Sequence, residues 1–130
     1  PQGAALEQRH AYGIPKRLQL NQWALAGEWT IGQEKVLLDH AGGAIAYRFH
    51  ARDVHLVLSR GADEPIPFRV LVDGSAPGRA HGLDVDEEGT GVLGDGRLYQ
   101  LVREHDTVRE RTMEITFDAP GVEAYVFTFG

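Results

Sequence analysis

Apolar and polar residues alternate along most of this chain in short runs. Residues 44–50 show the pattern most clearly, with Ile45, Tyr47 and Phe49 on one parity and Ala46, Arg48 and His50 on the other. Successive side chains of a strand point to opposite faces of a sheet, whereas apolar residues of a helix recur every three to four positions. The alternation therefore predicts a strand with one face in a core and the other open to water or a ligand.

The same pattern predicts several further strands. They cover residues 18–20, 29–31, 36–38, 54–58, 68–72, 97–103, 113–117 and 125–129. In the last of these, Tyr125, Phe127 and Phe129 are expected to point to a single side. Sixteen glycines and six prolines separate the runs, and Asp73-Gly74 is a strong signal for a tight turn.

Eight to ten short strands with regular turn signals predict an all-β domain. We expect a jelly-roll β-sandwich of two antiparallel sheets, because two packed sheets bury both inner faces. A closed barrel is the alternative. The module is expected to cover residues 12–130. Residues 1–11, which include the helix-compatible stretch 4–10, are interpreted as a linker or the remnant of an upstream domain.

Charge and composition narrow the range of partners. The chain has no cysteine, and its 13 Lys and Arg residues against 19 Asp and Glu residues give a formal charge of -6. A nucleic-acid partner is not expected, because no basic stripe is visible that would replace the counterions of phosphates. No run approaches the ~18 apolar residues of a membrane span, so the sequence predicts no membrane-spanning helix.

Polar and aromatic residues of the strands form the candidate ligand-binding surface. The candidates are Trp29, Arg48, His50, Arg69, Tyr99 and Arg103. Flat aromatic rings stack on the C–H face of a sugar, and the planar donors of arginine and histidine bind hydroxyls, so such a surface would suit a carbohydrate. The alternative is that the tryptophans are core residues and the arginines form surface ion pairs.

One acidic segment partly fits a calcium-binding loop. Asp84, Asp86, Glu88 and Asp95 supply carboxylates around Gly89, although the third and the last ligand depart from the usual pattern. The alternative is a solvated acidic hairpin loop. The six histidines do not occur in metal-binding spacings, and no nucleophile motif or carboxylate pair stands out. We therefore expect no cofactor and no enzymatic activity, with a small hydrolase as the least favoured alternative.

Several segments together resemble a known domain. They include Leu18-x-Leu-Asn-x-Trp23, Ala26-Gly-Glu-Trp29, Ala41-Gly-Gly-Ala-Ile-Ala-Tyr-Arg-Phe-His-Ala-Arg-Asp53, Phe68-Arg-Val-Leu-Val-Asp-Gly74, Arg97-Leu-Tyr-Gln-Leu-Val-Arg103 and Gly121-Val-Glu-Ala-Tyr-Val-Phe-Thr-Phe-Gly130. About residues 12–130 resemble the C-terminal module of DipZ-type proteins. Those proteins are similar to fusions of a cytochrome-c-biogenesis-type membrane domain, an extracytoplasmic thioredoxin-like domain and a carbohydrate-binding-module-like jelly roll.

The resemblance implies an extracytoplasmic location, tethered through the parent membrane protein, and a thioredoxin-like domain of the same polypeptide as partner. The thioredoxin Cys-x-x-Cys motif is absent, so disulfide exchange does not carry over to this chain. The leading hypothesis is an accessory module that binds a carbohydrate or cell-envelope glycan. The alternative is a protein-interaction or scaffolding module that docks on the thioredoxin-like domain or its clients.

Overall fold

The computed structural model describes residues 9–14, 18–61 and 63–130, and it is built almost entirely from strands. They are β1 (Arg9–Tyr12), β2 (Trp23–Ile31), β3 (Val36–Leu38), β4 (Ala44–His50), β5 (Asp53–Arg60), β6 (Ile66–Val72), β7 (Thr90–Leu93), β8 (Arg97–Arg103), β9 (Glu110–Phe117) and β10 (Val122–Phe129). A single 3-10 turn, Gly78–Ala80, lies between β6 and β7. The all-β prediction and the expected number of strands are confirmed for the part of the chain that the structure describes.

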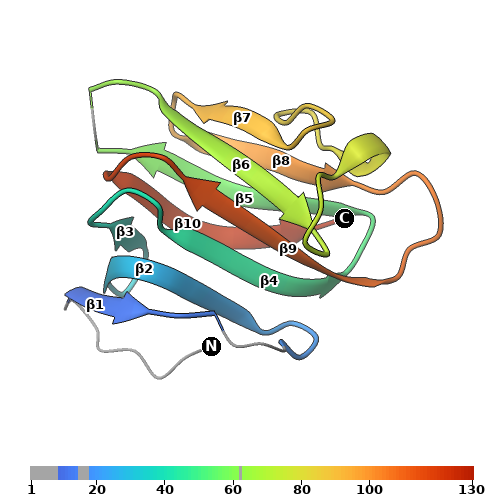
Figure 1. The fold of residues 1–130 in the computed structure, drawn as a ribbon, viewed down its shortest axis with the longest axis horizontal. Helices are drawn as coiled ribbons and strands as arrows, with labels where there is room; N and C mark the ends of the chain where they lie inside the picture. Colours follow the sequence, from blue (N-terminus) through green and yellow to red (C-terminus); the bar gives the residue numbers. More distant parts are fainter. Residues whose placement is uncertain (1–8, 15–17, 62) are drawn as a thin grey trace.

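The strands form one antiparallel sheet that curls over on itself. Its order is β7-β6-β9-β4-β2-β3-β10-β5-β8, and β1 adds to β2. Figure 1 shows β6, β9 and β4 in front of β5, β10 and β8. The two layers are therefore the front and back halves of one sheet, and the expectation of two separate sheets is corrected.

The long strand β2 joins the two halves. Its first residues, 23–26, pair with β4 in the front half, and Trp29, Thr30 and Ile31 pair with β3 in the back half. Gly27 lies between these two pairings with a φ of 94°. A Cβ at this position would lie 2.8 Å from the Cα of Gly43, so only glycine allows the strand to pass from one half to the other here.

The core lies between the two halves. Edge-to-face aromatic contacts cross it, with ring centroids 6.3 Å apart for Trp29 and Phe117 and 6.3 Å apart for Phe68 and Tyr99. Phe68 also contacts Phe117 within the front half. This geometry is the favoured one for aromatic pairs, and the buried rings dominate the apolar contacts of a core. The parity predicted for residues 44–50 is confirmed, since Ile45 and Phe49 are buried here.

The predicted strands agree with the structure where the alternation is long. Residues 44–50 and 97–103 coincide with β4 and β8, whereas β7 was missed because its only apolar residues are Val92 and Leu93. Residues 18–20 form no strand. Leu18 is instead buried against Ala24 and Ala46, on the outer side of the front half.

The amino-terminal expectation is only partly covered by the described residues. Arg9, His10 and Ala11 belong to β1, and all three pair with residues of β2. They are therefore part of the sheet rather than a linker. Residues 1–8, which include most of the helix-compatible stretch, lie outside the described residues. No helix in the described part of the chain has the length and apolar character needed to cross a membrane.

Candidate functional site

Two of the residues predicted to bind a ligand are core residues. Trp29 is 0% exposed and Tyr99 is 1% exposed. The Trp29 indole donates a hydrogen bond to the carbonyl of Ala26, and the Tyr99 hydroxyl donates one to the carbonyl of Asp95. Their polar atoms are thus satisfied within the fold, and neither ring has a free face for a ligand. The prediction that these two rings contact a ligand at the surface is wrong.

Three other predicted residues share the outer face of the front half. Arg48 donates hydrogen bonds to Glu110 at 3.0 Å and to Thr112 at 2.9 Å, both on the neighbouring strand β9. His50 lies opposite Glu110 in the strand register, and Arg69 lies opposite Thr116. His50 and Arg69 are exposed. This outer face is polar, and Arg48 is engaged in an ion pair with Glu110.

Arg103 lies in the other half of the sheet. It is at the end of β8, and its Nε is 3.7 Å from Oδ1 of the buried Asp53. The simple alternation expected for β8 is broken, because its pairing with β5 shifts between Val102 and Gln100. The two halves of the curled sheet also turn their outer faces in opposite directions. The six predicted residues therefore do not line one common groove, because two are buried and the other four are divided between two halves.

Two of the four candidate calcium ligands, Asp84 and Asp86, are engaged in other interactions through their carboxylates. Asp84 accepts hydrogen bonds from Arg97 at 2.8 Å and from the backbone N–H of Gln100 at 2.8 Å. Burial acts to raise the pKa of Asp84, but these two hydrogen bonds outweigh it and lower the pKa. Asp86 accepts hydrogen bonds from the backbone N–H groups of Glu88 and Thr90, which closes the turn. Among the described residues, no group of three or more acidic or histidine side chains could hold a metal ion.

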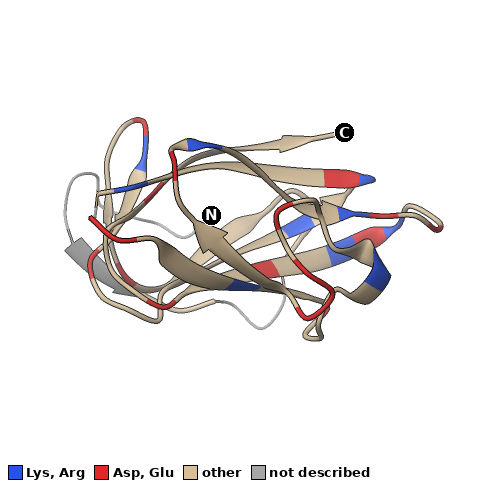
Figure 2. Ribbon diagram, turned by 90° about the horizontal axis from the view of Figure 1, so that it is seen from above, with Lys and Arg blue, Asp and Glu red and all other residues tan. Residues whose placement is uncertain are grey.

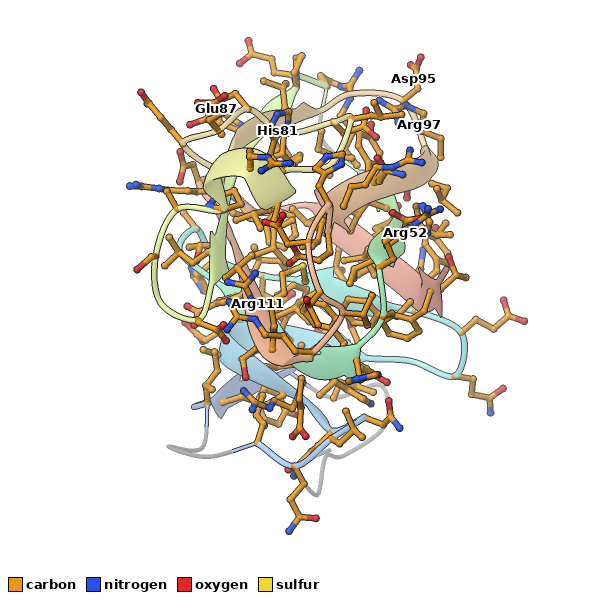
Figure 3. All side chains as sticks on the ribbon, turned by 90° about the vertical axis from the view of Figure 1, so that its right-hand side faces the viewer. Arg52, His81, Glu87, Asp95, Arg97 and Arg111 are labelled. Atoms are coloured by element: carbon orange, nitrogen blue, oxygen red, sulfur yellow. The ribbon has the colours of Figure 1, made fainter. Side chains whose placement is uncertain are left out.

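Charged residues gather where the loops at one end of the sheet meet. Figure 2 shows acidic and basic segments side by side at the right-hand end of the molecule. Figure 3 looks at this end and shows Arg52 in the turn between β4 and β5, His81 after the 3-10 turn, and Arg111 on β9. We call this region the charged loop end and define it by Arg52, Asp53, Asp73, Arg79, His81, Arg103, Glu104, His105, Asp106 and Arg111.

Arg111 is the centre of the charged loop end. Its Nε donates to Asp73 at 2.9 Å and its Nη1 donates to Glu104 at 2.9 Å. Burial acts to raise the pKa of both carboxyls, but hydrogen bonds from Arg111 and from backbone N–H groups lower the pKa of each overall. Asp73 and Gly74 have φ angles of 52° and 80°, which confirms the predicted tight turn. Arg111 thereby ties this turn to the loop that follows β8.

A polar cavity of about 550 Å³ opens beside this network. It is lined by Arg52, His81, Leu83, Arg103, Glu104, His105 and Asp106. Its ionised side chains are paired, since Glu104 binds Arg111 and both Arg52 and Arg103 lie within 4 Å of Asp53. Opposite charges that are already paired leave little net attraction for a charged ligand.

An apolar groove of about 350 Å³ opens on the side of the molecule near β2 and β10. We call it the aromatic groove. It is lined by Trp23, Leu25, Ile31, Gly32, Gln33, Glu34, Lys35, Val36, Ile45, Tyr47, Leu56, Ala124, Tyr125 and Phe127. The apolar side chains come from β2, β3, β4, β5 and β10, so both halves of the sheet contribute. The polar residues Gln33, Glu34 and Lys35 belong to the loop between β2 and β3.

Aromatic rings surround the open end of this groove. The ring of Tyr47 lies 4.7 Å from that of Phe127 and 5.1 Å from that of Phe129, and the two phenylalanine rings are nearly parallel at 6.3 Å. Trp23 lies opposite Tyr47 in the register of β2 and β4. Burial raises the pKa of the Tyr47 phenol. Phe129 remains 40% exposed, so the cluster is packed on one side and open on the other.

A β-bulge separates Tyr125 from this cluster. The pairing of β10 with β5 shifts between Ala124 and Phe127, so the simple alternation is broken there. Tyr125 therefore shares a 3.1 Å hydrogen bond with Ser59, whereas Phe127 contacts Tyr47. The prediction that Tyr125, Phe127 and Phe129 point to a single side is wrong for Tyr125.

A polar network forms the rim of the groove. Lys35 donates to Glu123, and its ammonium nitrogen lies 5.9 Å from the centroid of the Tyr125 ring. The hydrogen bond from Lys35 lowers the pKa of Glu123 and raises the pKa of Lys35 itself. Ser59 also donates to Glu123 at 3.0 Å. The charge of Lys35 is thus balanced, while the neighbouring Glu34 is exposed.

The alternating aromatic residues of β4 and β10 contribute to the groove, whereas the sequence pattern predicts that they belong to the core. The alternation predicts Tyr47 on the core side of β4, and it predicts Tyr125, Phe127 and Phe129 on a single side of the last strand. The structure leaves the rings of Tyr47, Phe127 and Phe129 partly exposed, because β3 is only three residues long and does not cover them. A pattern of alternating residues cannot show how long the neighbouring strand will be.

The amino-acid sequence of the chain matches a known protein family. No curated protein matches the chain. The profile of the family described as "Thioredoxin like C-terminal domain" matches residues 1–130. This match confirms the expected relation to thioredoxin-like proteins. The chain therefore belongs to the family of C-terminal domains that accompany thioredoxin-like proteins.

Proposed function

We propose that this domain is a non-catalytic binding module that holds a protein client beside a thioredoxin-like domain. The observation that carries the proposal is the aromatic groove, in which Tyr47, Phe127 and other apolar side chains remain accessible at the surface. Protein interfaces have an apolar centre, rich in aromatic residues, and a polar rim. The groove has this arrangement, since the ion pair of Lys35 and Glu123 lies at its edge.

The chemistry of the chain supports an accessory role. It contains no cysteine, so any thiol-disulfide exchange has to be carried out by another domain. The polar groups at the charged loop end bind one another, and Arg111 is held between Asp73 and Glu104. Such a network stabilises loops rather than activating a nucleophile or a base. The resemblance to DipZ-type proteins supports an extracytoplasmic location with the thioredoxin-like domain in the same polypeptide.

The proposal is tested with a permanently unfolded protein as the probe. Fluorescence anisotropy of labelled, reduced and carboxymethylated α-lactalbumin should show binding to the domain. Tyr47→Ala should weaken this binding at least tenfold, because Tyr47 contacts both Phe127 and Phe129. The matched control is Arg69→Ala, on the outer face of the front half, which should leave the affinity unchanged. Equal affinities of the two variants would refute the groove as the binding site.

A carbohydrate or cell-envelope glycan is a second candidate ligand for the same groove. It is favoured by the partly exposed rings of Trp23, Tyr47 and Phe129, because aromatic rings stack on the C–H faces of sugars. The groove offers polar partners mainly at one end, at Gln33 and Glu34. Calorimetric titration with envelope glycan fragments tests this candidate, and heat that disappears in Tyr47→Ala would support it over a protein client.

A further inference from the structure

The strand β10 has an open edge beside the aromatic groove. In the sheet β10 lies between β3 and β5. It pairs with β5 at 122–124 and, after the bulge, at 127–129, but with β3 only at Glu123 and Ala124. The register with β3 ends where the loop at Lys35 begins. The edge of β10 from Tyr125 onward therefore continues past the end of its neighbouring strand.

The hydrogen bonds of Gly130 show which backbone groups face this edge. The N–H of Gly130 donates to the carbonyl of Asp53 at 3.2 Å, and the N–H of Asp53 donates to the carbonyl of Gly130 at 3.1 Å. In an antiparallel pair, alternate residues direct their N–H and C=O groups to opposite edges. Gly130 directs both groups to β5, so Phe129 and Phe127 direct theirs to the open edge. Among the described residues no strand pairs with this part of the edge, so it offers the hydrogen-bonding pattern of a strand end without a neighbour.

The groove lies where the side chains of an added strand would point. If β3 began earlier in the chain, its added residues would lie beside the open edge of β10. At this position the groove is lined by Leu25, Ile45 and Leu56. Every second side chain of a strand in this position would enter the groove, and the others would face solvent. The apolar lining fits aliphatic or aromatic side chains at the inward positions.

The charge at the end of the groove further defines the ligand. Lys35 is paired with Glu123, and Glu34 beside it is exposed, so this end carries a net negative charge. The whole chain also has a formal charge of -6. If one end of the ligand lies near Glu34, a basic residue at that end would complement this charge.

We infer that the domain binds an extended polypeptide segment by strand addition to β10, antiparallel and in line with β3. Alternate apolar side chains of the segment occupy the aromatic groove, and a basic residue at its carboxyl end lies near Glu34. Backbone hydrogen bonds supply affinity and the groove selects the side chains, as in other cases of strand addition. The inference deepens the proposed function and rests on it, because it specifies how the client is held.

A synthetic peptide of alternating valine and threonine, with a lysine near its amidated carboxyl end, is the probe. One control peptide has the same composition in scrambled order, and a second carries N-methyl groups on the backbone nitrogens that face β10. Strand addition predicts that scrambling and N-methylation each weaken binding at least tenfold, because N-methylation removes donors without changing side chains. NMR-detected hydrogen exchange should show new protection of the amides of Phe127 and Phe129.

Protein variants then separate the contributions of the edge, the groove and the charge. Tyr47→Ala should weaken peptide binding at least tenfold, Glu34→Gln should weaken it about threefold at low salt, and Arg69→Ala should have no effect. Tyr47→Ala is checked for folding by circular dichroism, and the N-methylated peptide needs no variant at all. The effect of Glu34→Gln should disappear at high salt, since an exposed charge is screened.

The outcomes distinguish this inference from the proposed function. Binding of the peptide that is insensitive to N-methylation would overturn strand addition and leave the groove as a protein site. Binding of unfolded α-lactalbumin through Tyr47, without binding of the alternating peptide, would do the same. Failure of both probes at millimolar concentration would overturn both proposals.

Discussion

The aromatic groove and the charged loop end differ in the groups that they expose: the first leaves apolar rings open to water, and the second pairs its charged groups with one another. At the loop end, Arg111 binds Asp73 and Glu104, and each carboxylate also accepts a hydrogen bond from a backbone N–H group. In the groove, Tyr47, Phe127 and Phe129 contact one another and stay partly exposed to water. Exposed apolar rings cost free energy that a ligand can recover, whereas satisfied polar groups gain little from one. The comparison assigns stability to the loop end and recognition to the groove.

The largest expected effect on stability comes from breaking the network at its centre. Arg111→Met should lower the free energy of unfolding by about 3 kcal/mol, because it leaves Glu104, which is only 8% exposed, without its cationic partner. Urea denaturation followed by circular dichroism measures the change. Arg79→Met is the matched control, since Arg79 and Asp106 form an exposed pair and such pairs contribute little. A similar loss in both variants would contradict the central role of Arg111.

A smaller effect is expected in the groove. Phe127→Ala should lower the free energy of unfolding by about 1–2 kcal/mol, less than the loss for a fully buried phenylalanine, since this ring is only partly covered. Thermal unfolding at neutral pH measures the loss of stability of this variant relative to the wild-type protein. Binding of the unfolded protein probe should fall at least tenfold in the same variant. A loss of stability as large as that of Arg111→Met would indicate that the groove is part of the structural core.

The charged loop end and the aromatic groove should also differ in how their contributions to stability depend on pH. The pKa values of Asp73 and Glu104 are lowered in the folded state, so their stabilisation is present above their unfolded values of about 3.9 and 4.3 and is lost as the pH falls through the lower folded values. The wild-type protein should therefore lose stability progressively below about pH 5. Urea titrations between pH 6 and pH 2.5 should show a flatter curve for Arg111→Met and an unchanged slope for Phe127→Ala.

The smallest effect is expected on the outer face of the front half. Arg69→Ser should change the free energy of unfolding by less than about 0.5 kcal/mol, because Arg69 is exposed on a strand whose inner face forms the core. The same variant should retain full binding of the peptide and of any glycan that the groove accepts. If sugar binding disappeared in Arg69→Ser while the groove variants kept it, the sheet face would become the ligand site.

The strands were largely predictable from the sequence, and the site was not. The bounds of β4 and β8 were predictable because each is a run of seven residues rich in apolar side chains, with glycines nearby. Alternation could not show that Trp29 and Tyr99 face the core rather than solvent, since an aromatic ring fits both positions. Nor could it show the bulge after Ala124, because an extra residue in a strand leaves no mark on composition.

Local patterns by themselves determined the elements of this domain. Alternating residues form strands, glycines and Asp73-Gly74 form turns, and a chain without cysteine has no thiol of its own. The tertiary structure alone decided where those strands meet. The turn of β2 at Gly27 folds one sheet into two facing halves, and the short β3 leaves β10 and the rings of Tyr47 and Phe127 uncovered. Such pairings depend on contacts between residues far apart in the chain, which no local pattern encodes.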